Sequence, residues 1–433
     1  MPYVLGIDLG RTSTVAALAR RQGATWARPE VQRLHGQSAA VPSVLRLAPD
    51  GSFTVGEPAG PPDGAENGRT ARDFVARVGD DVPLIVGGET CTAQALAAVL
   101  VAWVVEQVTT RERARPEAVV LSHPACWGPY RRDLLHRALW EIGLADVTLL
   151  PQPITAAEAH AARGFTGATA AVYCLGGTGF EAGLVRRAPH GGFEVLGVPA
   201  ALEPLGGADF DEALAEHVRD ALGRPAAARD RRHGFAPADL LARCARARHD
   251  LTVATDTDVA LRLPHGPIRV PVSRAEFEEL IRPAVRTTVE LTAQAIRSAG
   301  RTAADLDGIL LTGGCARIPL VAELLAARFA RPVEVEADPQ ATSAVGAALA
   351  AGHVVAPRPI RPQPRPARDR DARAGRAEAV RRAEAVRRAD RAPQRYADDR
   401  PEPPPRPPVR VAPLELPSAS RLAVLRGRGR GRR

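Results

Sequence analysis

The sequence contains no lysine, few aromatic residues and no long apolar run. All 58 basic residues are arginine, and aromatic residues make up 4% of the 433 positions. The longest apolar run, at 95–105, is too short to span a bilayer and is predicted to be a buried helix. The chain opens without the basic segment, apolar stretch and cleavage site of a secretory signal. We therefore expect a cytoplasmic protein with no membrane span.

Cysteines are too few and too scattered to build a disulfide framework. There are five, an odd number, and none forms a CxxC pair. Such spacing favours free thiols in a reducing compartment over a zinc site. The five are Cys91, Cys126, Cys174, Cys244 and Cys315.

Positive charge is concentrated in the last part of the chain. Residues 357–433 carry 22 arginines against nine acidic residues, whereas the preceding residues carry 36 basic and 40 acidic ones. The basic excess therefore belongs to a tail that is rich in Pro and Arg. Its few large apolar residues cannot offset the entropy lost on ordering. We predict a folded domain over 1–356 and a disordered tail over 357–433.

The body repeats a strand–turn–strand pattern. Residues 3–19 and 170–185 each read as two apolar strands around a glycine turn, and each is followed by further strands and helices. This repetition predicts a duplicated α/β fold around a ligand cleft, with lobe I over about 1–185 and lobe II over about 186–356. Further strands are expected at 119–122, 147–150 and 309–312, and helices at 131–142, 155–162, 277–299 and 320–329. In the longest helix, one apolar face is predicted from Phe277, Leu280, Ile281, Ala284, Thr288 and Leu291.

Glycine turns between paired strands suit anion binding, because several backbone N–H groups can converge on one phosphate. A single turn is weak support, since any hairpin needs glycine. Two such turns, together with Gly206–Gly207 and Gly313–Gly314, favour a phosphate-binding cleft.

Four segments match one known family in order and spacing. Residues 6–13 (GIDLGRTS) resemble its first phosphate loop, G-I-D-L-G-T-T-N, and residues 174–181 (CLGGTGFE) its second, D-L-G-G-G-T-F-D. Residues 206–211 (GGADFD) resemble G-G-E-D-F-D, and residues 311–319 (LTGGCARIP) resemble L-V-G-G-S-T-R-I-P. Over roughly 1–352 the chain thus resembles the ATPase domain of the heat shock protein 70 (DnaK-like) family. The resemblance implies an actin-like, ribonuclease H-like duplicated fold whose two lobes close on ATP or ADP with Mg²⁺.

The resemblance also assigns roles to individual residues. Asp8 would hold Mg²⁺ through water, although it could instead serve only the turn's own N–H groups. Arg317 would stack on the base, although Arg248 and Arg317 could be ordinary solvated helix residues. The implied nucleotide-binding residues are Gly10, Thr12, Ser13, Gly176, Gly177, Thr178, Gly206, Gly207, Arg248, His249, Thr252, Gly313, Gly314, Cys315 and Arg317.

Several departures from the family pattern affect positions that serve ATP hydrolysis rather than nucleotide binding. The family's catalytic lysine falls on or near Val75, its glutamate on Gln152, and the aspartate and threonine of its second loop on Cys174 and Gly179. Losing a general base typically costs ~10²–10⁴ in rate. We therefore expect the residues at these family catalytic positions to be inert and ATP hydrolysis to be weak or lost. The departures at Ala245 and Gln340 concern adenosine contacts and imply weaker nucleotide affinity.

Local rearrangement could still rescue the site. Arg72 or Arg77 could supply positive charge, and Glu181 or Asp209 a carboxylate.

Three functions therefore remain open. The first is an ATP-binding, chaperone-like switch or scaffold with protein partners reached through the body or the tail. Since no alternating strand pattern follows residue 356, no peptide-binding domain is expected. The second is an active ATPase with a rearranged site. The third is binding of nucleic acid or an acidic surface through the arginine-rich tail. A sugar kinase of the same fold is disfavoured by the GGxDFD and LxGGxxRIP segments.

Overall fold

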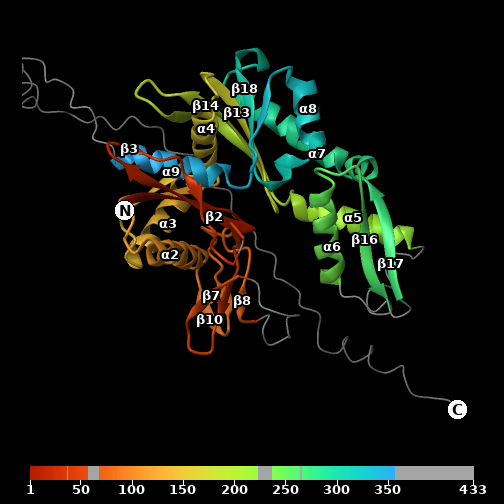
Figure 1. Cartoon of the computed structure of the whole chain (residues 1–433), viewed down its shortest axis with the longest axis horizontal. Helices are drawn as coiled ribbons and strands as arrows, with labels where there is room; N and C mark the ends of the chain where they lie inside the picture. Colours follow the sequence, from red (N-terminus) through yellow and green to blue (C-terminus); the bar gives the residue numbers. More distant parts are fainter. Residues whose placement is uncertain (37, 57–67, 223–236, 264–265, 356–433) are drawn as a thin grey trace, which may run out of the picture. The chain divides into compact units, whose positions relative to one another are not determined.

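Two β-sheets organise the part of the chain that the computed structural model describes, namely residues 1–36, 38–56, 68–222, 237–263 and 266–355 (Figure 1). These residues belong to one unit, Met1–Arg358. The tail predicted over 357–433 lies outside the described residues.

The first sheet is built around an N-terminal hairpin. Strands β1 and β2 pair antiparallel, β11 runs parallel to β1, and β12 runs parallel to β11. Every residue of β1 is buried, as expected of a strand covered on both faces. The strands are β1 (Tyr3–Leu9), β2 (Ser13–Gln22), β3 (Thr25–Trp26), β4 (Glu30–Val31), β5 (Ala40–Pro42), β11 (Val119–His123) and β12 (Val147–Pro151).

The second sheet repeats this pairing. Strands β13 and β14 form an antiparallel hairpin, β18 runs parallel to β13, and β19 runs parallel to β18. Because both hairpins occupy the same place in their sheets, the duplication predicted from the sequence is confirmed. The strands are β13 (Thr169–Leu175), β14 (Phe180–Arg187), β15 (Phe193–Leu202), β18 (Gly308–Thr312) and β19 (Val333–Val335).

Helices follow the parallel strands at matching places. Helices α3 (Pro129–Glu141) and α8 (Pro319–Phe329) come after β11 and β18, while α4 (Gln152–Ala162) and α9 (Thr342–Val355) come after β12 and β19. Helices α4 and α9 contact each other, and α9 also packs on β1 and β2 (Figure 1). At this crossing, a Cβ on Gly346 would overlap the carbonyl oxygen of Thr155.

The sheets also place the division between the halves differently from the sequence prediction. The second sheet begins at Thr169, before the expected lobe boundary near residue 185. Helix α9 then returns to the first sheet, although the sequence analysis assigns it to lobe II. A hairpin shows its own strands in the sequence, but it does not show which sheet those strands join.

The remaining elements extend each half away from the sheets. Helix α2 contributes eight buried residues to the core beside the first sheet. By length and composition alone it is also long and apolar enough to cross a membrane, and 44% of its apolar 18-residue window is buried. In the other half, α5 and α6 pack together and the β16–β17 hairpin contacts α6. Their bounds are α2 (Ala93–Glu112), α5 (Gly207–Ala221), α6 (Pro237–Asp250), β16 (Asp256–Leu263), β17 (Gly266–Ser273) and α7 (Arg274–Ser298), and the short strands are β6 (Leu45–Leu47), β7 (Phe53–Val55), β8 (Thr70–Ala71), β9 (Leu84–Val86) and β10 (Glu89–Cys91).

The buried face of α7 differs from the predicted one. Ser273 caps the helix by accepting from the backbone N–H of Glu276, whose carboxylate accepts from Ser273 in return. Leu280, predicted to be inside, is 37% exposed, whereas Val285 is fully buried. The face is therefore rotated, and it buries Phe277, Ile281, Val285, Thr288, Val289, Thr292, Ala293, Ala295 and Ile296.

Candidate functional site

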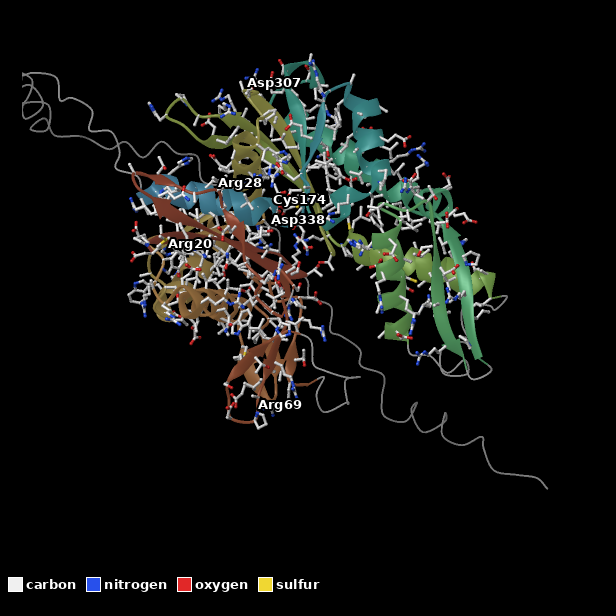
Figure 2. The ribbon with its side chains drawn as sticks, viewed as in Figure 1. Arg20, Arg28, Arg69, Cys174, Asp307 and Asp338 are labelled. Carbon is white, nitrogen blue, oxygen red and sulfur yellow. The ribbon has the colours of Figure 1, made fainter. Side chains whose placement is uncertain are left out.

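A cavity of about 530 Å³ lies where the glycine turns of the two sheets meet. That volume is typical of a site for a small organic ligand. Cys174 and Asp338, both labelled in Figure 2, line it from the second half of the fold. The lining contains the following residues from the sequence prediction: Asp8, Gly10, Thr12, Ser13, Gln152, Cys174, Gly176, Gly177, Thr178, Arg248, His249, Gly313, Gly314, Cys315 and Arg317.

The first turn joins β1 to β2 and is held by Ser43. The Ser43 hydroxyl donates to the carbonyl of Gly10 at 2.7 Å, and its backbone N–H donates to the carbonyl of Thr12. A Cβ on Gly10 would overlap the carbonyl oxygen of Ser13, so this tight turn requires glycine. The turn therefore keeps one fixed shape at the cavity wall.

The second turn joins β13 to β14 and rests on the start of α5. The N–H of Gly207 donates to the carbonyl of Gly176 at 3.0 Å, and the N–H of Ala208 donates to the carbonyl of Gly177 at 2.7 Å. A Cβ on Gly206 would lie 2.7 Å from the Gly177 backbone. Gly206 and Gly207, predicted to bind cofactor, thus lie behind the turn and support it, and they are not among the lining residues.

The two turns touch across the cavity. The hydroxyls of Thr12 and Thr178 are 3.2 Å apart, within hydrogen-bond distance. Nearby, the side-chain amide of Gln340 donates to the Ser13 hydroxyl at 3.1 Å. One ligand can therefore contact both halves of the fold at once.

Acidic side chains gather beside the turns. Burial raises the pKa of Asp8 to about 7, an effect opposed by hydrogen bonds with Ser122 and Gln152 and reinforced by the charge of Glu181. Burial also raises the pKa of Glu181. A bound cation would favour the ionised form of both carboxyl groups.

These two carboxylates fit the Mg²⁺ that the sequence resemblance implies. Protein-bound Mg²⁺ is usually held by one or two carboxylates together with the phosphates of its substrate. Among the described residues, no group of three His, Cys, Asp or Glu side chains forms a metal site by itself. Asp8 and Glu181 would hold Mg²⁺ only with ligands from a phosphate, where the ion would neutralise charge.

Cys174, the residue at the start of the second turn, carries an uncharged thiol. Burial raises the pKa of the Cys174 thiol well above its usual value, and the charges of Glu181 and Asp8 add to this. The thiol is therefore protonated at neutral pH and cannot replace a carboxylate.

The cavity lining also contains two arginines that are paired with aspartates. Arg248 on α6 donates to both carboxylate oxygens of Asp211, at 2.7 and 3.1 Å. Arg317 donates to Asp338 at 2.8 Å. Planar guanidinium groups held in this way present a face on which an aromatic base can stack.

Some predicted site residues lie elsewhere. Val75 is fully buried in the core of the first half and is not a lining residue. Thr252 donates to the carbonyl of His249 and also lies outside the lining. Arg77, a candidate replacement cation, instead donates to Asp80 and to the carbonyl of Val82. Asp209, a candidate replacement carboxylate, caps α5 by accepting from the N–H of Gly206.

Other lining residues received no binding role from the sequence. Arg11 lies in the first turn and contacts Glu181 and Glu203 in the other half, while Asp338 fixes Arg317. Their partners are distant in sequence, so no local pattern indicates them.

Comparison with known proteins identifies the family. The model of the Hsp70 protein family matches residues 65–361. The chain is 31% identical over 372 residues to the chaperone protein HscA homolog of Bordetella petrii, covering 80% of this chain and 57% of that protein. It is 30% identical over 380 residues to the HscA homolog of Burkholderia pseudomallei, covering 80% and 58%.

The chain thus spans less than two thirds of the length of these curated relatives. The actin-like ATPase fold expected from the sequence is confirmed by the family match and by the mixed α/β sheets. Members of this family bind adenine nucleotides through this domain, and the chain belongs to the Hsp70 family.

Proposed function

We propose that this chain is an ATP- and ADP-binding, chaperone-like switch whose hydrolysis of ATP is weak or lost. The observation that carries the proposal is the cavity lined by both glycine turns, one from each sheet. A ligand that bridges the turns stabilises one arrangement of the two halves, which is how a nucleotide can act as a conformational switch. Among the lining residues, the glycine turns suit a phosphate chain, and the paired arginines suit a base.

Weak hydrolysis is supported by the chemistry of three side chains. Gln152 is an amide and cannot accept a proton, Cys174 is held as a neutral thiol, and Val75 is buried in the apolar core. Phosphoryl transfer depends on positioned charge, metal and an oriented water. With these groups absent, we expect a bound nucleotide to persist.

An active ATPase with a rearranged site is the second candidate. The observation in its favour is that Glu181, buried and lining the cavity, brings a carboxylate to the second turn. Burial raises the pKa of this carboxyl above its usual value, the direction that suits a general base.

Calorimetric titration with Mg-ATP and Mg-ADP, followed by phosphate release over hours, tests the proposal. We expect saturable binding with almost no release. Turnover that disappears in Asp8→Ala would favour the second candidate, and no heat with either nucleotide would sink both.

The activity of the longer relatives comes to this chain only as a proposal. We propose a cytoplasmic chaperone-like role, with protein partners contacted by the body over 1–356 or by the tail over 357–433. Deleting 357–433 and measuring retention on nucleic acid at low salt tests whether the tail binds it.

A further inference from the structure

Three arginines line the cavity, and one of them has no assigned role. Arg248 and Arg317 are each paired with an aspartate. Arg11 lies in the first glycine turn.

The Arg11 side chain crosses from the first half to the second. It forms an ion pair with Glu203, its Nη2 lies 3.8 Å from Oε1 of Glu181, and the side chain is only 10% exposed. A Cβ on Gly179 would overlap its Nη1, so the guanidinium lies directly against the second turn. The group is thus held between the two turns.

Two departures from the family pattern are sterically linked here. Arg11 stands where the first loop has threonine in the resemblance, and Gly179 stands where the second loop has threonine. Because a side chain at 179 would occupy the place of the guanidinium, the glycine makes room for the arginine. Neither residue alone would place a guanidinium against the second turn.

Resting on the nucleotide binding proposed above, we propose that Arg11 recognises the terminal phosphate of ATP and makes the site prefer ATP to ADP. The guanidinium fork fits a phosphate as well as it fits a carboxylate. The guanidinium pairs with Glu203, whose side chain is 41% exposed and is readily solvated after release. The terminal phosphate replaces Glu203 as the partner of Arg11, so ATP binding breaks the ion pair between Arg11 and Glu203.

The test is calorimetric titration of the full chain with Mg-ATP and Mg-ADP. Arg11→Ala is expected to weaken ATP binding at least about 10-fold, since charge-assisted contacts are among the stronger polar interactions, and to change ADP binding less than about threefold. Glu203→Gln removes the competing carboxylate and is expected to strengthen ATP binding severalfold. Arg21→Ala is the matched control. Arg21 lies on β2, the strand that follows the first turn, pairs with Glu117, and lies outside the cavity lining.

The possible outcomes separate the two proposals. If the unmodified chain binds neither nucleotide, the proposed function fails and this inference fails with it. If the unmodified chain binds both, and Arg11→Ala weakens neither or both equally, only the role of Arg11 is overturned. Should Arg11→Ala fail to fold, Gly179→Val displaces the guanidinium while keeping its charge, and must show the same selective loss.

Discussion

The side-chain amide of Gln152 donates a hydrogen bond to Oδ1 of Asp8 over 3.4 Å. Asp8 lies near the end of β1 and Gln152 follows β12, and both strands run parallel to β11, so the sheet brings their ends to one edge. At this position a carboxylate would repel Asp8, whereas the amide stabilises its ionised form. The amide of Gln152 therefore stabilises the ionised form of Asp8, but it cannot itself act as a general base.

Asp8→Asn should stabilise the nucleotide-free protein at high pH. The pKa of Asp8 rises from 3.8 to about 7 on folding. Between these values the folded state binds the extra proton, so the contribution of Asp8 to the free energy of unfolding falls as the pH rises from about 4 to 7. At one pKa unit per ~1.4 kcal/mol, the variant gains about 1–4 kcal/mol at pH 8. Denaturant unfolding at pH 4, 6 and 8 measures the gain, which should shrink toward zero at pH 4.

Asp50→Asn is the control for this prediction. Its exposed carboxylate accepts two hydrogen bonds from Ser52, which lower its pKa. This variant should gain no stability at any pH. An Asp8→Asn gain that does not vary with pH would contradict the assignment of Asp8 as a buried, titrating group.

Gln152→Glu should increase the rate of ATP hydrolysis. The change places a proton acceptor next to Asp8, and a general base contributes ~10²–10⁴ to a rate. We expect at least about a 10-fold gain in single-turnover phosphate release, with the full effect limited by the neutral Cys174. Gln22→Glu, an exposed change of the same chemistry at the end of β2, should leave the rate unaltered. An unchanged rate in Gln152→Glu would mean that another missing group limits the reaction.

The sequence predicts the duplicated hairpins and most of the cavity because both depend on local patterns. Glycine between two apolar strands marks each turn, and the turns then converge once the strands pair. The ranges predicted as paired strands, 3–19 and 170–185, contain β1 with β2 and β13 with β14 in the structure. The resemblance puts Val75 at a catalytic position, but Phe74, Val75 and Val78 are all buried core residues, and burial of this segment depends on tertiary packing.

The cross-cavity contacts could not be read from the sequence. Arg11 and Glu203 are 192 residues apart, and an arginine in a turn is ordinarily solvent-exposed. The packing of Gly206 behind the second turn is likewise tertiary, since the same glycine pair also fits direct phosphate binding. For both Arg11 and Gly206 the local sequence fits two roles, and only the packing of the second half of the fold determines which role the residue has.

Cys126 should react slowly with alkylating agents despite being an exposed residue. Its thiol donates to Oε1 of Glu181 at 3.0 Å, and burial of the thiol, followed by the charge of Glu181, raises its pKa to about 12. Since the thiolate is the reactive form, iodoacetamide at pH 8 should modify it at least about 10-fold more slowly than in the urea-unfolded chain. Mass spectrometry of the labelled peptide gives the rate.

Glu181→Gln provides the complementary measurement. Removing the charge should lower the pKa of the thiol and speed its alkylation, and Cys126→Ser, which lacks the thiol, identifies the peptide. Equal rates in the folded and unfolded chain would contradict the contact between the thiol and Glu181.

Gly346→Ala should destabilise the whole body rather than the cavity alone. Helices α4 and α9 cross at this residue, and the added Cβ would overlap the backbone carbonyl of Thr155, which cannot rotate away as a side chain could. Overpacking typically costs about 1–3 kcal/mol, and a backbone clash belongs at or above the upper end, outweighing the alanine's helix propensity of about 1 kcal/mol. Gly128→Ala, with φ of −68° and no atom near its Cβ, should cost no more than about 1 kcal/mol, the usual cost of alanine at a helix N-cap. Because α9 joins the first sheet and α4 contacts the second, a loss confined to one half would contradict the view that this crossing couples them.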